Sequence, residues 1–529
     1  MTQNEKLLEH NKFERKNQQL TLPMDMEITI PQDDPVRLAS AQLEELDYRE
    51  LYRAYSSQGR KSAAEPRIIF EVLVYGYMCG IYSTRKLEEA CRKRVDFMWL
   101  LNGEPVPDYS TFARFRTGRT KEAVEDLFYQ FVRRLEQMGE TEHDEVFIDG
   151  TKLESRANRY TFVWRKTTEK YLAKVKDAVR EEFESRGISG NVTLKKFREL
   201  VKSEKAACEK NGIHFVHGAG RRKPPRQRAY EKIFTLLEKW EGYEKKLFLM
   251  GNSRNSYAKT DPDATFMHMK EDHMRNGQLK PGYNVQIAVN SEYITGAAAF
   301  SNRTDSGTLR PFLRRLEQQH GERYRDIVAD AGYESLDNYL YLEGNGQTSF
   351  IKPINCEAQK TRKFKQQIGR RENMQYDEQQ DCYFCAAGRK LAFRRESTQL
   401  NRQGHFLTTA YYRCENCADC PCREACCKAK DGKPKELQVK TDLLRLSERS
   451  LQNILTERGI RLRINRSIQV EGAFGVLKND RKFKRFLTRG RTNISTELYL
   501  LCLGYNLNKL WAKCNAGRLK THLFCLQKE

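Results

Sequence analysis

The chain has 529 residues, of which 39% are hydrophobic, and a formal net charge of +23. This hydrophobic content excludes a disordered chain, and the length is typical of about two to four structural units rather than one core. The positive charge favours a polyanionic partner, most commonly a nucleic acid, although a ribosome or a membrane surface also fits a basic balance.

Targeting signals and cysteine usage indicate where the protein works. The N-terminal residues are too polar for a signal peptide, and no apolar run approaches the roughly 18 residues of a membrane helix. We therefore expect a cytoplasmic protein without a membrane segment, whose 15 cysteines are not disulfide-bonded. Eight of these cysteines lie within residues 382–427, which indicates metal binding in that segment.

Helical patterns follow a polar N-terminal arm. The stretch "EPRIIFEVLVYGYMCG" predicts an apolar helix that begins at Pro66 and ends at Gly80. Asp108 or Ser110 is expected to cap a further helix that runs to Gly139. Short helices with basic faces fit a helix-turn-helix DNA reader and a supporting helical bundle equally well, because docking geometry is invisible in sequence.

Strand patterns begin with "EVFIDGTKLE" and are then interrupted by charge-rich helical segments. They resume at "YNVQIAVNSEYITGAAAFSN", "DIVADAG" and "TSFIKP", and a cysteine-rich segment and final helices follow. The predicted units are a flexible arm 1–34, a helical domain 35–139, a first part of an α/β core 140–163, a charged helical insertion 164–250, a second core part 251–359, a Cys-rich insertion 360–440, final core helices 441–515 and a basic tail 516–529.

Two carboxylates end apolar strands in the same way. "VFIDG" and "IVADAG" each place an Asp, Asp149 and Asp330, after three apolar residues and before a small residue. Strand ends of open sheets line functional crevices, and two adjacent carboxylates need positive charge, for which Mg²⁺ is the favoured cation. Taken singly, Asp149 also fits a hairpin turn, and Asp330 fits the cap of a helix that begins near Ser335.

A third acidic residue precedes a basic stretch near the C-terminus. In "RSIQVEGAFGVLKNDRKFKRFLTRGR", read as a helix, Glu471 and Lys478 lie two turns apart on one face, and Lys482 falls on that face too. A carboxylate beside a basic stripe suits a metal ligand next to a phosphate backbone. An amphipathic helix with a solvated basic face is the alternative interpretation.

These blocks, in this order, resemble a DDE transposase of bacterial insertion sequences. "YSSQGRKSAAEPRIIFEVLVYGYMCGIYSTRKLEEACRKRVDFMWLLNGEPVPDYSTFARFR" resembles the InsH-type N-terminal helical domain of that family. "FIDGTKLESRANRYTFVWRK", "TDPDATFMHMK", "KPGYNVQIAV", "DAGYES" and "VEGAFGVLK" resemble its catalytic blocks. The resemblance implies an RNase H-like (retroviral-integrase-type) mixed sheet flanked by helices, with an all-α N-terminal domain and two insertions.

The resemblance also implies the roles of individual residues. Asp149, Asp330 and Glu471 are the expected catalytic carboxylates, which ligate two Mg²⁺ ions about 3.5–4 Å apart, and Mn²⁺ can substitute. The expected DNA-binding residues are Arg466, Lys478, Lys482 and Arg485. The family's Y-R-E-K signature fits only in part, because its Tyr and Arg positions hold Ile464 and Ser467, and Arg466 is one residue away.

Three further acids compete for these roles. "TDPDA" and "NRTDSGTL" place Asp261, Asp263 and Asp305 in polar, turn-like segments. We interpret them as supporting or structural residues, and Asp305 is the one to test next.

The implied function is cleavage of double-stranded DNA at terminal inverted repeats and joining of the 3′-OH ends to target DNA. A homodimer on DNA is expected because two ends are brought together, and the expected location is the bacterial cytoplasm near the nucleoid. The alternatives are an RNase H-like nuclease without strand transfer and a non-catalytic, transposase-derived zinc-ribbon DNA-binding protein.

The cysteine-rich segment predicts a structural zinc. Paired CxxC units favour tetrahedral Zn²⁺, and a β-hairpin is expected to fill the wide gap between Cys385 and Cys414. A zinc-ribbon remnant that binds no metal is the alternative. The candidate ligands are Cys382, Cys385, Cys414, Cys417, Cys420 and Cys422.

Overall fold

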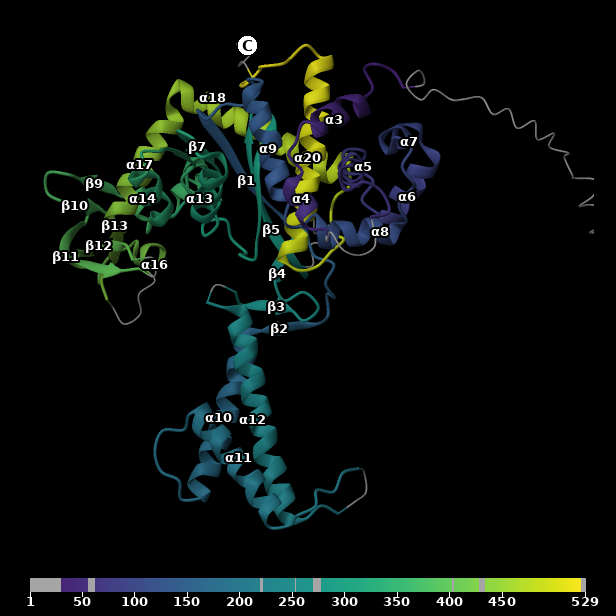
Figure 1. Ribbon diagram of the computed structural model, residues 1–529. Coiled ribbons are helices and arrows are strands. Elements are labelled where there is room, and N and C mark those ends of the chain that lie inside the picture. Colours follow the sequence, from purple (N-terminus) through teal and green to yellow (C-terminus); the bar gives the residue numbers. More distant parts are fainter. Residues whose placement is uncertain are drawn as a thin grey trace, which may run out of the picture.

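A computed structural model describes residues 30–55, 62–218, 222–252, 254–269, 277–401, 404–427 and 433–524. The predicted flexible arm 1–34 lies almost entirely outside these residues. The described part combines helices with a mixed sheet, a five-stranded antiparallel sheet and a two-stranded ribbon (Figure 1). None of the described helices has the length and apolar composition that crossing a membrane requires.

The N-terminal part is entirely helical. Asp108 caps α8 by accepting a hydrogen bond from the Thr111 backbone N–H at 2.6 Å. The single long helix predicted up to Gly139 is wrong, because a π-helical turn at Phe115–Arg119 and a further turn separate α8 from α9. The helices are α3 (Pro35–Glu44), α4 (Arg49–Arg53), α5 (Pro66–Met78), α6 (Thr84–Lys93), α7 (Val95–Leu101), α8 (Tyr109–Arg114) and α9 (Val124–Gln137).

The central sheet mixes parallel and antiparallel strands. Its order is β4-β5-β1-β7-β8, with β6 also paired to β5. Strands β7 and β8 run parallel to β1, and β5 runs antiparallel to it. This mixed sheet fits the expected RNase H-like core. The strands are β1 (Glu145–Glu154), β4 (Thr265–His268), β5 (Leu279–Asn290), β6 (Tyr293–Phe300), β7 (Asp326–Ala329) and β8 (Thr348–Ile351).

Helices from both ends of the chain cover the sheet. Helix α20 (Arg491–Asn515) packs against α5, α9 and β6, and its middle is buried on nearly all sides. Gly504 permits the contact with α5, because an added Cβ would lie 2.6 Å from the Met78 backbone nitrogen. One continuous hydrophobic core therefore joins the N-terminal helices to one side of the sheet.

The other side of the sheet is covered by α13 (Leu309–His320), α14 (Leu336–Gly344) and α17 (Thr441–Leu455). Ser335 caps α14 by accepting from the Asn338 backbone N–H at 3.2 Å. Helix α18 (Glu457–Arg466) follows α17 and leads into the segment that carries Glu471.

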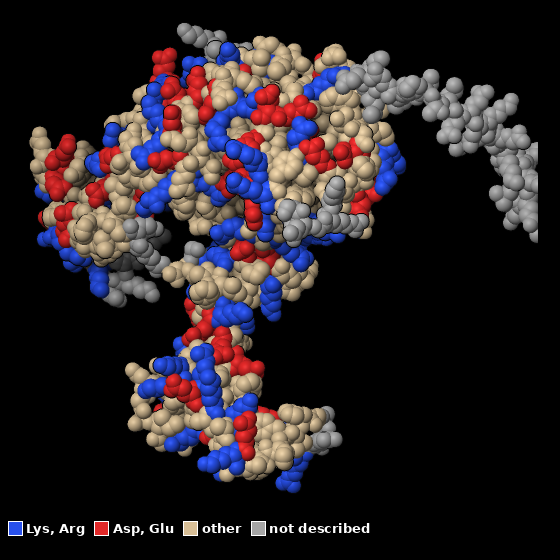
Figure 2. Space-filling view, viewed as in Figure 1, with Lys and Arg blue, Asp and Glu red and all other residues tan. Residues whose placement is uncertain are grey.

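The charged segment between β1 and β5 forms a separate helical unit that projects away from the sheet (Figure 1). Its helices α10 (Arg165–Ser185), α11 (Leu194–Lys210) and α12 (Pro225–Met250) share their own hydrophobic core. Strands β2 (Phe162–Trp164) and β3 (Ser256–Ala258) pair at its base. In Figure 2 the visible face of this unit carries Lys and Arg interspersed with Asp and Glu.

The cysteine-rich segment forms a five-stranded antiparallel sheet beside α14 and α17 (Figure 1). The predicted β-hairpin between Cys385 and Cys414 is confirmed, because β11 and β12 pair along most of their length. The elements are α15 (Arg362–Lys365), β9 (Gln375–Asp377), β10 (Cys382–Phe384), β11 (Lys390–Leu400), β12 (Phe406–Cys414), α16 (Arg423–Cys426) and β13 (Glu436–Lys440).

Candidate active site

Two aspartates lie side by side on neighbouring parallel strands. Ile148 of β1 is in register with Ala329 of β7, so Asp149 and Asp330 occupy the next positions on each strand. Strand β1 continues through Asp149 to Glu154, and the hairpin-turn interpretation of Asp149 is therefore wrong. Asp330 follows the last residue of β7, at the edge where open sheets bind ligands.

Asp330 has a local structural role as well. Its Oδ1 accepts a hydrogen bond from the Gly332 backbone N–H at 2.8 Å, which caps a 3₁₀ turn at Ala331–Tyr333. The helix near Ser335 is capped by Ser335 itself, so the interpretation of Asp330 as the cap of that helix is wrong. The other carboxylate oxygen of Asp330 is not used by this cap.

Arg466, the last residue of α18, contacts the same site. Its Nη1 lies 3.4 Å from Asp149 Oδ2, and both side chains are largely buried. Asp149 also accepts a hydrogen bond from the Gly150 backbone N–H at 2.7 Å. A guanidinium against a buried carboxylate offsets the cost of burying that charge. Arg466, predicted from its position beside the family signature, is therefore in contact with the first predicted carboxylate.

A fourth acid lies next to the two aspartates. A Cβ added to Gly332 would lie 3.0 Å from Asp330 Oδ1 and 3.3 Å from Asp305 Oδ2. One added to Gly150 would lie 2.8 Å from Asp305 Oδ1. The Asp305 carboxylate therefore lies between the residues that follow the two predicted catalytic aspartates. Asp305 was interpreted from sequence as a supporting or structural residue and as the rival acid to test next. Its exact position was not predictable, because it depends on how the chain folds after β6.

Amide side chains of β5 hold Asp305 in place. Asn284 Nδ2 donates to Asp305 Oδ1 at 2.7 Å, and Gln286 Nε2 donates to the same oxygen at 3.0 Å. The buried Tyr333 hydroxyl in turn donates to Gln286 Oε1. Burial raises the pKa of Tyr333 well above its usual value, and the carboxylates of Asp305, Asp149 and Asp330 raise it further. Sequence reasoning missed this polar network, because its members share no spacing motif.

The remaining rival acids are structural. Asp261 is buried and accepts hydrogen bonds from Ser155 Oγ at 2.6 Å and from the Tyr283 hydroxyl at 2.9 Å. Asp263 Oδ2 accepts from the Arg491 backbone N–H at 2.9 Å and thereby fixes the start of α20. Both acids hold loops in place, as their turn-like sequences indicated.

Glu471 lies on a helical segment that packs against β1 and β5. This segment alternates α and π turns, with π turns at Ser467–Glu471 and Val476–Asp480. The Glu471 side chain is exposed, and Oε1 accepts a hydrogen bond from Ser467 Oγ at 2.9 Å. Among the described residues, the three predicted carboxylates do not bring their oxygens all within 4.8 Å of one another.

The predicted basic stripe is only partly helical. The helix ends at Asp480, and Lys482 has a φ of 55°, so the prediction that Lys482 continues the face of Glu471 and Lys478 is wrong. Arg485 Nε donates to the Ser155 carbonyl oxygen at 3.1 Å and lies 3.7 Å from Glu154 Oε1. Arg485 thus ties this segment to the end of β1, although its side chain remains 44% exposed.

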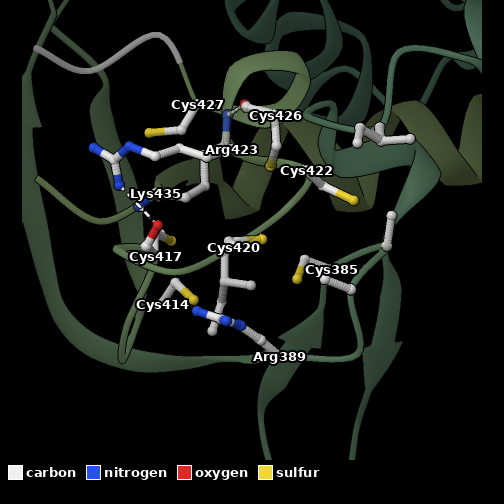
Figure 3. Close-up of a pocket in the computed structure, with 14 residues that line it drawn as sticks. Cys385, Arg389, Cys414, Cys417, Cys420, Cys422, Arg423, Cys426, Cys427 and Lys435 are labelled. Atoms are coloured by element: carbon white, nitrogen blue, oxygen red, sulfur yellow. Dashed lines mark hydrogen bonds between the residues drawn. The ribbon is translucent and has the colours of Figure 1, made fainter. Parts of the chain in front are cut away.

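The cysteine-rich sheet contains a small cavity lined by thiols (Figure 3). Its volume is about 10 Å³, which is room for one atom-sized guest. Cys382 is fully buried within β10 and does not line this cavity, whereas Cys426 and Cys427, which were not predicted as ligands, do. The seven cysteines on the cavity are Cys385, Cys414, Cys417, Cys420, Cys422, Cys426 and Cys427.

Four of these thiols also pack together in the hydrophobic core of this sheet: Cys385, Cys414, Cys417 and Cys426. Burial and the neighbouring Cys417 raise the pKa of Cys414 to about 11. The Lys435 backbone N–H donates to Cys417 Sγ at 3.3 Å. Without a bound cation the Cys414 thiol therefore stays protonated at neutral pH. A thiophilic metal ion would reverse this by stabilising the thiolate.

Two families of known domains match the chain. The Transposase DDE domain matches residues 384–511, and the Transposase domain DUF772 matches residues 24–118. Together the matches indicate an insertion-sequence DDE transposase. The first match contains Glu471 and the seven cysteines of the cavity, but it begins after Asp149 and Asp330 in the sequence. A search of curated proteins found no match to the chain.

These matches support the interpretation of the transposase as an enzyme that cleaves and joins DNA. Divalent metal ions are the general cofactors of DDE transposases, and DNA is the partner on which transposases act. In this transposase Asp149 lies on β1, Asp330 directly follows β7, and Arg466 is the last residue of α18.

Proposed function

We propose that this transposase binds the terminal inverted repeats of its insertion sequence, cleaves them and joins the 3′-OH ends to target DNA. The observation that carries this proposal is the adjacent placement of Asp149 and Asp330 on parallel strands β1 and β7, opposite Arg466. A DNA-bound homodimer follows from the need to hold two ends together.

The donor set of this site fits a hard divalent cation. Asp149 and Asp330 offer carboxylate oxygens, and Asp305 adds a third carboxylate nearby that amide donors already hold. Mg²⁺ prefers such oxygen ligands, and Mn²⁺ accepts the same set. We assign Asp149 and Asp330 as ligands and Glu471 as the residue that completes the site. Bound divalent cations supply charge neutralisation and a lowered pKa of the attacking water or 3′-OH.

The chain's own residues then position the DNA. Arg466 neutralises Asp149 in the absence of DNA and is placed to turn toward a phosphate oxygen when the backbone enters. The positive charge continues along the same segment through Lys478, Lys482 and Arg485. Contacts between such cationic side chains and DNA phosphates supply much of the energy of DNA binding. Phosphoryl transfer requires mainly such positioning and electrostatic compensation, with little covalent participation by the protein.

We also propose one structural zinc in the cysteine-rich sheet, held by Cys385, Cys414, Cys417 and Cys426. This set is supported by the shared cavity and by the packing of all four thiols in one core. It replaces the ligand set expected from sequence, because Cys382 does not line the cavity. A bound zinc would have to draw the thiols together, because no three of the described thiols have sulfur atoms all within 4.8 Å of one another.

The test of the proposed activity uses labelled terminal-repeat DNA, target DNA and Mg²⁺. The wild-type protein should cleave the ends and give joined products, whereas Asp330→Asn should bind the same DNA in a gel shift without cleaving it. Asp177→Asn, an exposed change on α10, is the matched control and should behave as wild type. Cleavage by Asp330→Asn at the wild-type rate would contradict the assignment. Cleavage without joining by the wild type would instead favour a nuclease.

A further inference from the structure

A second cluster of potential metal ligands lies away from the acidic site, where the N-terminal helices meet the sheet. Glu136 belongs to the last turn of α9, His143 precedes β1, and His320 is the last residue of α13. One ligand atom from each of these residues lies within 4.8 Å of the other two. Within the described part of the chain, this is the one set of three His, Cys, Asp or Glu residues with that property.

The distances match those of a tetrahedral zinc site. Glu136 Oε1 lies 3.2 Å from His143 Nε2 and 3.5 Å from His320 Nδ1. Zinc bonds of about 2.0–2.1 Å at tetrahedral angles place neighbouring ligand atoms about 3.3 Å apart. The Glu136 oxygen is therefore already at the spacing from both histidine nitrogens that one Zn²⁺ would impose, and the two nitrogens lie within 4.8 Å of each other.

The hydrogen bonding of His320 leaves its second nitrogen available as a ligand. His320 Nε2 lies 2.9 Å from the Thr295 carbonyl oxygen, which can only accept, so Nε2 carries the proton. The side chain is 1% exposed, and Nδ1 makes no hydrogen bond to any described residue. A buried lone pair aimed at a carboxylate is unfavourable unless a cation lies between them. A backbone carbonyl on the other ring nitrogen is the usual support of a zinc-bound histidine.

His143 is placed in the same way. Its Nε2 faces Glu136 and makes no hydrogen bond within the described residues, while its Nδ1 lies 3.9 Å from Glu322 Oε2. The two imidazole rings are 5.3 Å apart, and the Tyr324 ring packs against both. Burial lowers the pKa of His143, whereas the Glu136 carboxylate raises it. A neutral imidazole is the form that binds metal ions.

We propose that a structural Zn²⁺ is bound by Glu136, His143 and His320. It would connect the end of α9 to the residues before β1 and to the end of α13. The site is independent of the proposed DNA chemistry and of the thiol-lined cavity. The proposed zinc site lies near the start of β1, whereas Asp149 lies further along that strand. We therefore assign the zinc a structural rather than a catalytic role.

The test measures zinc per chain in full-length, untagged protein after dialysis against metal-free buffer. His143→Ala and Glu136→Ala should each contain one zinc fewer than wild type, whereas His217→Ala, an exposed change, should not. Equal zinc content in His143→Ala and wild type would overturn the proposal.

A variant could also lose zinc because it misfolds, so a second measurement uses the wild-type protein. Crystals of the wild-type protein, measured at the zinc absorption edge, should give an anomalous peak between the three side chains. The absence of that peak, with the residues ordered in the map, would overturn the proposal, since an ordinary Glu–His ion pair would then account for the cluster.

Discussion

Arg466 is the residue whose position links the helical segment of Glu471 to the sheet. Its guanidinium lies 3.4 Å from Asp149 Oδ2, and Nη1 makes no hydrogen bond to any described residue. An ion pair without a well-aligned hydrogen bond is held less firmly than a bidentate one. This geometry suits a side chain that exchanges a carboxylate for a phosphate during the reaction cycle.

Replacing Arg466 by Gln should therefore lower end cleavage by about 10²-fold, because a single preorganised charge at a reacting phosphate contributes on that order. The measurement is single-turnover cleavage of labelled end DNA with Mg²⁺. Arg461→Gln, an exposed change on the same helix, serves as the control and should leave the rate unchanged. Equal rates for wild type and Arg466→Gln would remove Arg466 from the proposed site.

Glu71 provides a test at the residue scale that does not depend on catalysis. This side chain of α5 is 4% exposed, its Oε1 makes no hydrogen bond to any described residue, and its closest cation, Arg67, is 3.7 Å away. Burial raises the pKa of Glu71 from 4.5 to about 7. The folded protein thus holds a proton that the unfolded chain releases at lower pH.

The free energy of unfolding should fall as pH rises from about 4.5 to about 7, because the native state binds the extra proton over that range. The full effect of this one group is up to about 3 kcal/mol above pH 7. Urea unfolding of wild type and Glu71→Gln from pH 5 to pH 8 checks it. The variant should gain stability relative to wild type as pH rises, and a constant difference would contradict the raised pKa.

At the scale of single elements, few apolar side chains stabilise the cysteine-rich sheet. Its hydrophobic core is small and includes four thiols, and long parts of β11 are exposed on both faces. Sheets of this size commonly need a metal or disulfides for stability. The thiol-lined cavity is therefore expected to contribute folding energy when zinc is bound.

Cys417→Ser should release zinc from this sheet and make residues 375–440 sensitive to protease at temperatures where the wild type resists cleavage. Limited proteolysis with mass spectrometry of the fragments measures this. Cys356→Ser, a change outside the cavity, is the control. Wild-type resistance in Cys417→Ser would mean that the sheet needs no metal.

Element boundaries show what the sequence could and could not predict. Apolar periodicity located α5, β1, β5 and β7. Asp108 was one of two predicted caps, with Ser110, and it is the cap because its side chain accepts from a neighbouring backbone N–H. The π turns around Glu471 and the end of the helix before Lys482 were not predictable from a 3.6-residue period. These turns depend on packing against β1 and β5 rather than on local propensity.

At the scale of the whole molecule, the N-terminal helices and the sheet share one core through α20, so helices α3–α9 and α20, distant in sequence, are folded together. The projecting unit α10–α12 has a separate core, and the β2–β3 ribbon lies at its base (Figure 1). The sequence indicated a helical insertion from its charge pattern. The shared core was not predictable, because it depends on contacts between residues more than 400 positions apart.

The candidate site was predictable where local sequence patterns mark its residues, and not where long-range contacts bring them in. Asp149, Asp330 and Arg466 were found from strand-end patterns and from a family resemblance, and the structure brings these three residues together. Asp305, Gln286 and Tyr333 join them only through the tertiary fold.

The most direct measurement is a change of metal specificity at Asp330. If Asp330 contacts a cation during cleavage, Asp330→Cys should lose activity with Mg²⁺ and regain part of it with the more thiophilic Mn²⁺. Asp177→Cys should cleave with either ion. Full Mg²⁺-dependent cleavage of end DNA by Asp330→Cys would contradict the claim that this strand-end aspartate ligates the catalytic metal.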